Sequence, residues 1–440
     1  MKKNGPKILA VVLLSVVAVL MAVAGSGSLL DVFSKNPNSQ GAVAPPNTEN
    51  DANDGNANES IPSGDNSLNA PEVENDFPIP STTGGSNRFT QSISLQSPSL
   101  NAVHDTVSGT YVIFTHSTDN GAFKVAKRSQ TIMKIDSQGN VISATSLQAP
   151  KETEYLSSKI TLEGLVVATK GGNRTLIYTI SYDFSQVDIL ELSLFSQVEL
   201  FSLNEGFLLF GKSKENTVYK IKNNVVLSSN TLQAGELKAV YDFSNYYTLF
   251  LSGINSYSTI KLSDSLKLLS SVTIPSKTLM EIEPIVENGE QKYIAVELSS
   301  SGVEIAKYST NFSIQESERV GVGMGDSVEV FMNSESILLL LHSTTERLYL
   351  VDKGLNFTSS TNNAFQGISK CYDCTSTSNG YKVLYSKEHT LTLVDLRNDG
   401  TLQSLNLDTQ TDKAFISLST EGEVAVVFVS QGSLEIIGIV

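Results

Sequence analysis

"TIMKIDSQGNVISATSL", residues 131–147, consists of two short runs of alternating apolar and polar residues with a polar turn between them. Alternation with a period of two is typical of β-strands that are buried on one face. Asp136 and Gly139 are residue types that favour a tight turn. The stretch therefore predicts two antiparallel strands joined by a turn.

The same unit recurs along the chain from Arg88 onward. Its copies occupy residues 109–139, 164–185, 206–224, 246–265, 292–311, 336–354, 380–400 and 423–440. The last apolar residues of the second run are taken as Ile135, Tyr182, Ile221, Leu262, Tyr308, Val351, Val394 and Ile437, which are 47, 39, 41, 46, 43, 43 and 43 residues apart. A period of about 40–50 residues built from short strands indicates a β-propeller with one four-stranded blade per unit.

The blades of such a ring must cover one another, because a single small sheet has two apolar faces that it cannot bury alone. The ring must also close, or strand edges stay exposed. "FTQSISLQSP" (89–98) ends like "NVISATSLQAP" (140–150), the end of the first unit, yet no blade precedes it. We therefore expect residues 89–97 to complete the last blade and to pair with the C-terminal strand. The sequence predicts an all-β, eight-bladed propeller, with seven blades as the alternative if residues 160–195 are not a full blade.

The N-terminus has the pattern of an export signal. Lys2, Lys3 and Lys7 precede an uncharged apolar run of 17 residues, Ile8 to Ala24, which lengthens to 23 if it continues to Leu30. A membrane-spanning helix needs about 17–25 apolar residues, whereas the core of a cleaved signal is about 7–15 residues long. The run predicts a transmembrane signal anchor over residues 8–30, and cleavage after Ala24 is the alternative. Both place the remainder outside the cytoplasm, with residues 1–7 as a cytoplasmic basic tail in the anchored case.

Residues 31–87 have the composition of a linker. They are rich in Asn, Pro, Gly and Ser and carry nine acidic residues against one basic residue, Lys35. Such a chain cannot bury enough apolar surface to offset the entropy of ordering it, so we expect a disordered acidic linker. The propeller domain is then residues 88–440.

Charge excludes one class of partner. The formal net charge is −15, and an acidic surface repels the phosphate backbone of nucleic acid. We expect no nucleic-acid partner, and we expect a monomer.

The repeats resemble those of β-propeller proteins of the bacterial envelope, over residues 88–440. "KIDSQGNV" (134–141) and "LVDLRNDGTL" (393–402) are similar to the turns of quinoprotein-type repeats. The chain has no Trp, whereas WD40 repeats carry a Trp-Asp signature and the eight-bladed envelope assembly lipoproteins carry a tryptophan docking motif. The resemblance implies a rigid disc with a central channel and implies no particular reaction.

The cysteines and histidines give little catalytic signal. Cys371 and Cys374 form a C-x-x-C, expected in the inner strand of a blade, which predicts a local disulfide or two free thiols rather than a redox site. The histidines are His104, His116, His342 and His389. They are too few, and too scattered over the units, to predict a metal site. We therefore predict no cofactor, no metal and no catalytic residue.

Acidic residues are the remaining candidates. Glu281 and Glu283 approach the inner strand of the fifth blade, and Asp326 and Glu329 approach that of the sixth. Because the starts of neighbouring inner strands meet at one mouth of the channel, these four residues predict an acidic channel mouth.

The pattern as a whole predicts a membrane-tethered, extracytoplasmic binding or scaffold protein that is not an enzyme and that engages a protein, peptide or glycan. The alternatives are a secreted polysaccharide-active enzyme that uses the channel-mouth carboxylates, and an envelope assembly factor.

Overall fold

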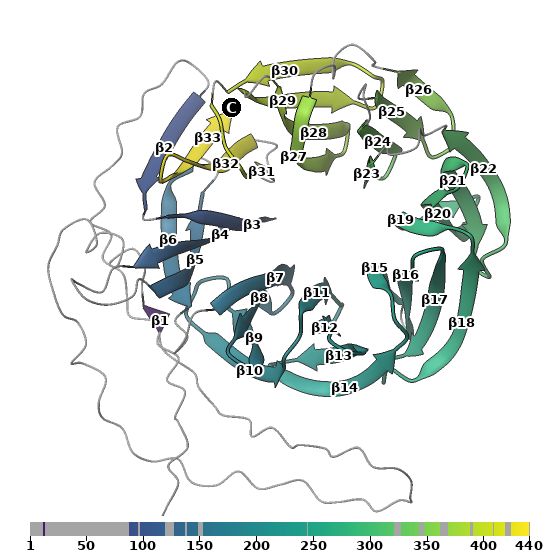
Figure 1. Ribbon diagram of the computed structural model, residues 1–440, viewed down its shortest axis with the longest axis horizontal. Helices are drawn as coiled ribbons and strands as arrows, with labels where there is room; N and C mark the ends of the chain where they lie inside the picture. The colour runs from purple at the N-terminus through teal and green to yellow at the C-terminus, as the bar shows by residue number, and fades with distance from the viewer. Residues whose placement is uncertain are drawn as a thin grey trace, which may run out of the picture.

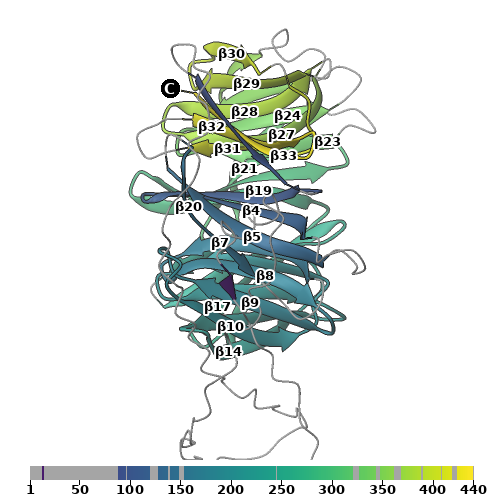
Figure 2. The ribbon, with the colours of Figure 1, turned by 90° about the vertical axis from the view of Figure 1, so that its left-hand side faces the viewer.

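Eight small antiparallel sheets are arranged in a ring (Figure 1). The computed structural model describes residues 12–13, 88–95, 97–118, 127–136, 139–147, 153–243, 245–320, 327–342, 347–360, 368–387, 390–407, 409–418 and 424–439. Seen from the side, the ring is a disc in which the sheets are stacked edge-on (Figure 2). The protein is therefore an eight-bladed β-propeller, as the repeat period predicted.

Each blade is a meander that starts at the channel and runs outward. The first four blades are formed by β3 (Ser99–Thr106), β4 (Gly109–Thr118), β5 (Lys127–Ile135) and β6 (Val141–Leu147); β7 (Thr153–Thr161), β8 (Gly164–Gly171), β9 (Arg174–Ile180) and β10 (Val187–Ser193); β11 (Gln197–Ser202), β12 (Phe207–Lys212), β13 (Asn216–Lys222) and β14 (Val225–Leu232); and β15 (Glu236–Phe243), β16 (Tyr246–Ser252), β17 (Ser256–Ser263) and β18 (Leu268–Pro275). The segment 160–195 thus belongs to a complete four-stranded blade, which excludes the seven-bladed alternative.

The other four blades follow the same order. They are formed by β19 (Thr278–Glu287), β20 (Glu290–Ser299), β21 (Gly302–Ser309) and β22 (Ile314–Val320); β23 (Ser327–Met332), β24 (Ser336–His342), β25 (Arg347–Asp352) and β26 (Phe357–Ser360); β27 (Ile368–Thr377), β28 (Gly380–Lys387), β29 (Thr390–Arg397) and β30 (Leu402–Asn406); and β31 (Ala414–Leu418), β32 (Val424–Ser430), β33 (Ser433–Ile439) and β2 (Arg88–Ser94). We call face A the side of the disc with the turns between first and second and between third and fourth strands. Face B carries the second-to-third turns and the connections between blades.

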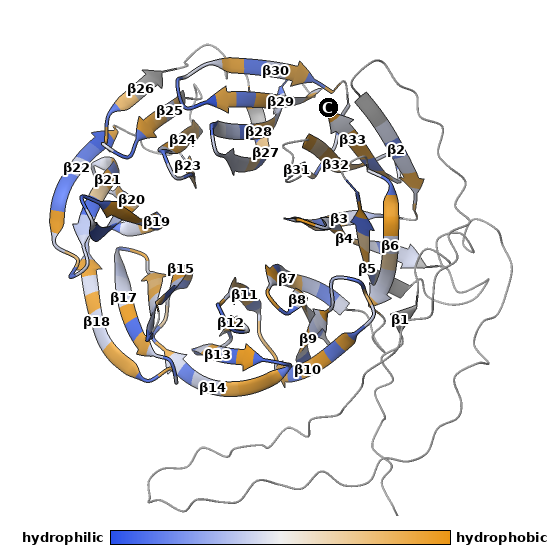
Figure 3. Cartoon of the chain, turned by 180° about the vertical axis from the view of Figure 1, so that it is seen from behind, coloured by the Kyte–Doolittle hydropathy of each residue, from blue (hydrophilic) through white to orange (hydrophobic). Residues whose placement is uncertain are grey.

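The core of the protein lies between the blades. Eight clusters of buried apolar side chains are found, and each draws its members from two adjacent blades. In β28, for example, Tyr381 and Val383 pack toward blade 6 whereas Leu384 packs toward blade 8. Alternation therefore gives every blade two apolar faces, and the ring is the arrangement that buries both. Apolar residues also lie on outer strands at the rim, where Leu227 and Leu268 are 54% and 60% exposed (Figure 3).

The two ends of the propeller share the eighth blade. β2 pairs antiparallel with β33, from Arg88 opposite Ile439 to Ser94 opposite Ser433. The backbone N–H of Leu95 extends the pairing by donating to the carbonyl of Gly432 at 3.0 Å. The outer strand of the last blade therefore comes from the start of the domain, which removes an unpaired edge from the C-terminal strand.

A glycine at the start of the second strand fixes the turn in several blades. At Gly380, φ is +151° and a Cβ atom would lie 2.0 Å from the carbonyl oxygen of Leu396. At Gly164, φ is +137° and a Cβ atom would lie 2.1 Å from the carbonyl oxygen of Ile180. In both blades the glycine lies against the carbonyl of one residue of the third strand, so Ile180 and Leu396 are equivalent residues. The sequence analysis had taken Tyr182 and Val394 as the equivalent residues, and each was wrong by two positions.

The predicted membrane segment lies almost entirely outside the described residues. Of residues 8–30 the structure describes only β1 (Val12–Leu13), a two-residue strand beside β6 on the first blade. Among the described residues, no helix combines the length and hydropathy that membrane crossing requires. The predicted linker, residues 31–87, also lies outside the described part of the chain, so anchor and linker stay predictions.

Candidate functional site

A bulge recurs in the inner strands and sets which way their side chains point. The pairing of first with second strand shifts by one residue in β3, β7, β15, β19 and β27. In β19 the shift falls between Leu279 and Glu281. A bulge inserts one unpaired residue and re-aims the side chains that follow it. Simple alternation along the sequence therefore fails at the channel wall.

Three of the four residues of the predicted acidic mouth, Glu281, Glu283 and Glu329, lie among the described residues, and the mouth itself stays a prediction. Glu281 is partly buried, and desolvation raises its pKa to about 7, although Lys238 of the neighbouring blade acts in the opposite direction. Glu283 instead forms an ion pair with Lys353 of blade 6, with an N–O distance of 2.6 Å. Glu329 interacts with Cys371 on the next inner strand. Asp326 lies outside the described residues. The charges of Glu281 and Glu283 act on each other, although their other partners differ.

Glu199 on the inner strand β11 is a partly buried carboxyl that the sequence analysis missed. Desolvation, followed by the charge of Glu236, raises its pKa to about 7. Lys238 opposes this shift, as it does for Glu281. Glutamates of blades 3 and 5 therefore flank one lysine of blade 4. The signal in the sequence was a glutamate between Val198 and Leu200, which are both buried.

The two cysteines are free thiols in the structure, which is the second of the two predicted states. Both lie on β27, where the bulge between Cys371 and Asp373 gives them partners two residues apart, Tyr385 and Val383. Although the two cysteines are three positions apart along the strand, they therefore lie on the same face, and both pack on the core between blades 6 and 7. Burial is the main cause that raises both thiol pKa values. A raised pKa disfavours the reactive thiolate.

Inner strands of neighbouring blades are joined by polar contacts. His104 shares a 2.6 Å hydrogen bond between its Nε2 and Ser158 Oγ of blade 2, and burial lowers its pKa to about 4. Asp105 accepts a 2.7 Å hydrogen bond from the backbone N–H of Leu418 in blade 8. Asp373 accepts one at 2.8 Å from the backbone N–H of Ile416. These carboxylates satisfy the free edge of β31, so their role is to hold the ring together.

The other described histidine side chain also has a structural environment. His116 is buried beside Thr131, whose Oγ1 lies 3.3 Å from His116 Nδ1, and burial lowers its pKa. The His342 side chain and His389 lie outside the described part of the chain. No group of three or more His, Cys, Asp or Glu side chains that could hold a metal ion is found among the described residues.

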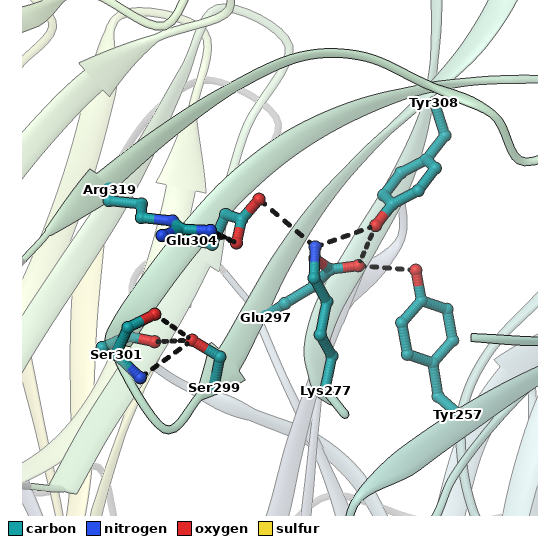
Figure 4. Close-up of polar contacts among 9 residues, drawn as sticks. Tyr257, Lys277, Glu297, Ser299, Ser301, Glu304, Tyr308 and Arg319 are labelled. Atoms are coloured by element: carbon teal, nitrogen blue, oxygen red, sulfur yellow. Dashed lines mark hydrogen bonds and ion pairs between the residues drawn. The ribbon is translucent and has the colours of Figure 1, made fainter. Parts of the chain in front are cut away.

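A buried charge network joins blades 4 and 5 near face B (Figure 4). Glu297, which is 0% exposed, accepts hydrogen bonds of 2.6 Å from the hydroxyls of Tyr257 and Tyr308. Lys277, in the connection between the two blades, donates to the other carboxylate oxygen at 2.6 Å. Burial opposes the charge of this lysine, but the hydrogen bond and charge of Glu297 outweigh it and raise the pKa to about 12.

The network continues to a second buried carboxylate. Glu304 lies 3.3 Å from the Lys277 ammonium and 3.2 Å from Arg319 Nη2. Burial disfavours its charge, yet Lys277 holds its pKa below the ordinary value. Two carboxylates and two cations balance each other, and each carboxylate has several donors. A network with this degree of satisfaction acts as a structural clamp between the blades.

A polar hollow of about 750 Å³ lies on face A, over blade 7 and beside blades 6 and 8. Its lining comes from the turn after β23 (Glu335), the turn after β27 (residues 377–379), β28 (Lys382), β29 (Asp395, Arg397), the turn after β29 (residues 398–399) and β31 (Leu418). Its volume falls in the range of about 300–1,000 Å³ that is usual for ligand sites. The sequence analysis missed this site, because its residues come from four separate segments.

One wall of the hollow is built from hydrogen bonds between blades 6 and 7. Asn398 donates from Nδ2 to Glu335 Oε2 at 2.7 Å and accepts at Oδ1 from Ser336 Oγ at 2.6 Å. Asn333, which is buried, donates to the carbonyl of Gly380 at 3.2 Å. The Tyr381 hydroxyl donates to the backbone carbonyl of Ser336 at 2.7 Å. The wall is therefore formed before any ligand arrives, which reduces the entropy lost on binding.

The opposite side of the hollow lies in the cleft between blades 7 and 8. Lys382 and Asp395 are cross-strand neighbours and form an ion pair of 2.7 Å. Arg397 follows two residues later on the same face of β29 and is exposed. Leu418 faces them from blade 8, where the apolar core between these blades ends. The hollow thus combines both charges with amide and hydroxyl groups.

Comparison with known proteins identifies the fold and no family. No family model and no curated protein sequence matches the chain. The solved propeller of Dos1 is similar over 79% of this chain and 94% of that chain, with 10% identity and a TM-score of 0.51. Similar structures at lower TM-scores are the Pan2 WD40 domain of Neurospora crassa (0.43, 11% identity, 65% and 89% covered) and the dihydro-heme d1 dehydrogenase NirN (0.49, 14% identity, 72% and 67% covered). The likeness is one of fold alone.

Proposed function

We propose that this protein is a membrane-tethered, extracytoplasmic binding propeller whose ligand docks in the hollow on face A. The observation that carries the proposal is the hollow itself, because its wall is held by hydrogen bonds between blades 6 and 7 and it presents an exposed Arg397. The apolar run Ile8 to Ala24 after three lysines supports the tether, and residues 31–87 supply a spacer between membrane and disc.

A blocking substitution tests the site. Ser378 lies in the turn at the rim of the hollow and is exposed, so Ser378→Trp should fill the entrance without disturbing a core. The matched control is Ser301→Trp, in an exposed turn on face B. The full-length protein is screened against panels of short peptides and of oligosaccharides by isothermal calorimetry. Binding that Ser378→Trp abolishes and Ser301→Trp preserves supports the proposal. Binding that survives Ser378→Trp contradicts it.

Membrane fractionation tests the tether. The full-length chain is expected to pellet with membranes after carbonate washing, and a chain lacking residues 8–24 is expected to stay in the supernatant. Sequencing of the mature N-terminus separates the two forms of the proposal, since cleavage after Ala24 would release the propeller. Recovery of the full-length chain in the cytoplasmic fraction would contradict both.

A polysaccharide-active enzyme is the second candidate, and the pKa values of Glu199 and Glu281 favour it. Both are about 7, which suits a general acid near neutral pH. Glycosidases pair one such protonated carboxyl with an ionised carboxylate, and Glu281 would serve as the acid. Hydrolysis of an oligosaccharide that Glu281→Gln abolishes would support the enzyme, and unchanged turnover would exclude this residue as its acid.

A further inference from the structure

Arg397 has hydrogen-bonding capacity that the rest of the hollow does not use. The residue paired with Arg397 on the neighbouring strand is Gly380, which has no side chain that could cover the guanidinium. Among the described residues the guanidinium has no hydrogen bond or ion pair, and its charge acts only on the exposed Asp399, whose pKa it helps to lower. Lys382, by contrast, is paired with Asp395 at 2.7 Å. A guanidinium presents several N–H donors in a planar fork, which matches the two oxygens of a carboxylate.

The acidic residues of the hollow are engaged elsewhere. Asp395 is paired with Lys382, Glu335 accepts from Asn398 at 2.7 Å, and Asp399 accepts from the backbone N–H of Thr401 at 2.8 Å. Each nevertheless keeps lone pairs, since an ionised carboxylate can accept about four hydrogen bonds. They are placed to accept hydrogen bonds from hydroxyl groups of a ligand.

The rim adds groups that both donate and accept. Residues 377–379, a threonine, a serine and an asparagine, form the turn between β27 and β28 at the edge of the hollow. Hydroxyl and amide side chains match a ligand whose own hydroxyls do both. A peptide would in addition need apolar pockets for its side chains, and Leu418 is the one aliphatic residue of the lining within the described chain.

We propose that the hollow binds an acidic saccharide, with a sugar carboxylate held by Arg397 and ring hydroxyls held by the carboxylates and the rim. The proposal rests on the proposed function and gives it a ligand class. The net charge of −15 opposes long-range attraction of an anion, so recognition depends on short-range hydrogen bonds to the fork of Arg397. Affinity should therefore depend on the guanidinium group as well as on positive charge.

Calorimetry on the full-length protein at physiological salt tests the ligand class. The probes are trigalacturonate, its methyl ester, neutral maltotriose and the acidic peptide triglutamate. Arg397→Ala is expected to weaken trigalacturonate binding by about tenfold or more, and Arg397→Lys is expected to weaken it by less, since lysine keeps the charge but loses the fork. Arg174→Ala is the control, because Arg174 is an exposed arginine of blade 2, far from the hollow, and should leave binding unchanged.

The outcomes separate the ligand class from the function. Preference for trigalacturonate over its methyl ester and maltotriose, lost in Arg397→Ala and kept in Arg174→Ala, supports the proposal. If the methyl ester binds as tightly as trigalacturonate, the role of the sugar carboxylate is refuted. If Arg397→Ala binds trigalacturonate as tightly as the wild type, the assignment of the site to Arg397 is refuted. If only triglutamate binds, and this binding depends on Arg397 and is blocked by Ser378→Trp, the ligand is not a saccharide while the proposed binding function stands. Failure of trigalacturonate to bind at all also overturns it.

Discussion

Removing the Lys277 ammonium should destabilise the propeller by several kcal/mol. Lys277→Met leaves the aliphatic stem but takes away the cation that lies 2.6 Å from Glu297 and 3.3 Å from Glu304. These carboxylates are 0% and 4% exposed, so water cannot replace the lost partner. Breaking a buried ion pair by deleting one member costs about 3–5 kcal/mol, because the remaining charge is left uncompensated. Folded domains are stable by only about 5–15 kcal/mol, so the loss should be large.

Urea unfolding of the full-length protein, followed by circular dichroism, measures the effect. The control is Lys170→Met, whose partner Glu154 is 3.6 Å away and whose side chain is 39% exposed. An exposed pair of this kind contributes about 0–1 kcal/mol. Adding Glu297→Gln to Lys277→Met should restore part of the stability, because the buried negative charge is then removed. If Lys277→Met costs no more than Lys170→Met, the assignment of a buried clamp is refuted.

Three further predictions concern other parts of the structure. In the folded state the pKa of Glu281 is raised to about 7 from its ordinary value of 4.5, so the stability that this group contributes is present at low pH and lost as the pH rises through that window. The urea midpoint of Glu281→Gln should therefore rise relative to that of the wild type between pH 5 and 7.5. Parallel profiles of the two midpoints against pH would contradict this. Gly380→Ala should cost about 1–3 kcal/mol and lower the melting temperature more than Gly172→Ala, since Gly172 has a positive φ but open space around it; equal shifts would count against the steric argument. A chain that begins at Ser99 lacks β2 and should melt at a lower temperature than one that begins at Arg88, because β33 loses its partner; equal melting temperatures would mean that the eighth blade does not need this strand.

The repeat period, together with the matching ending of residues 89–98, favoured eight blades over seven. Alternating residues such as those of "TIMKI" (131–135) define two-sided strands, and eight copies at a spacing of 39–47 residues define eight blades. The ending that residues 89–98 share with residues 140–150 pointed to the pairing that β2 and β33 make. These inferences succeeded because strand alternation and blade spacing are local properties, which each segment carries without reference to the others.

The candidate site could not be predicted from the sequence in the same way. The bulge in β19 changes the direction of Glu281 relative to simple alternation, and Glu283 is neutralised by Lys353, a residue 70 positions away. Glu199 and Glu281 have raised pKa values because of burial on the inner strands. The partners and the extent of burial cannot be identified from the neighbouring residues, although the position of Glu199 between Val198 and Leu200 was a local signal.

The sequence by itself therefore indicated the all-β class, favoured eight blades over seven and pointed to the way in which the ring closes, since these follow from local alternation, its period and one repeated ending. The tertiary structure alone decided which charges meet. Glu297 finds its cation and its two phenols only after the blades are packed. The physical reason is that electrostatic and hydrogen-bonding partners depend on distance and burial in space, which chain position does not specify.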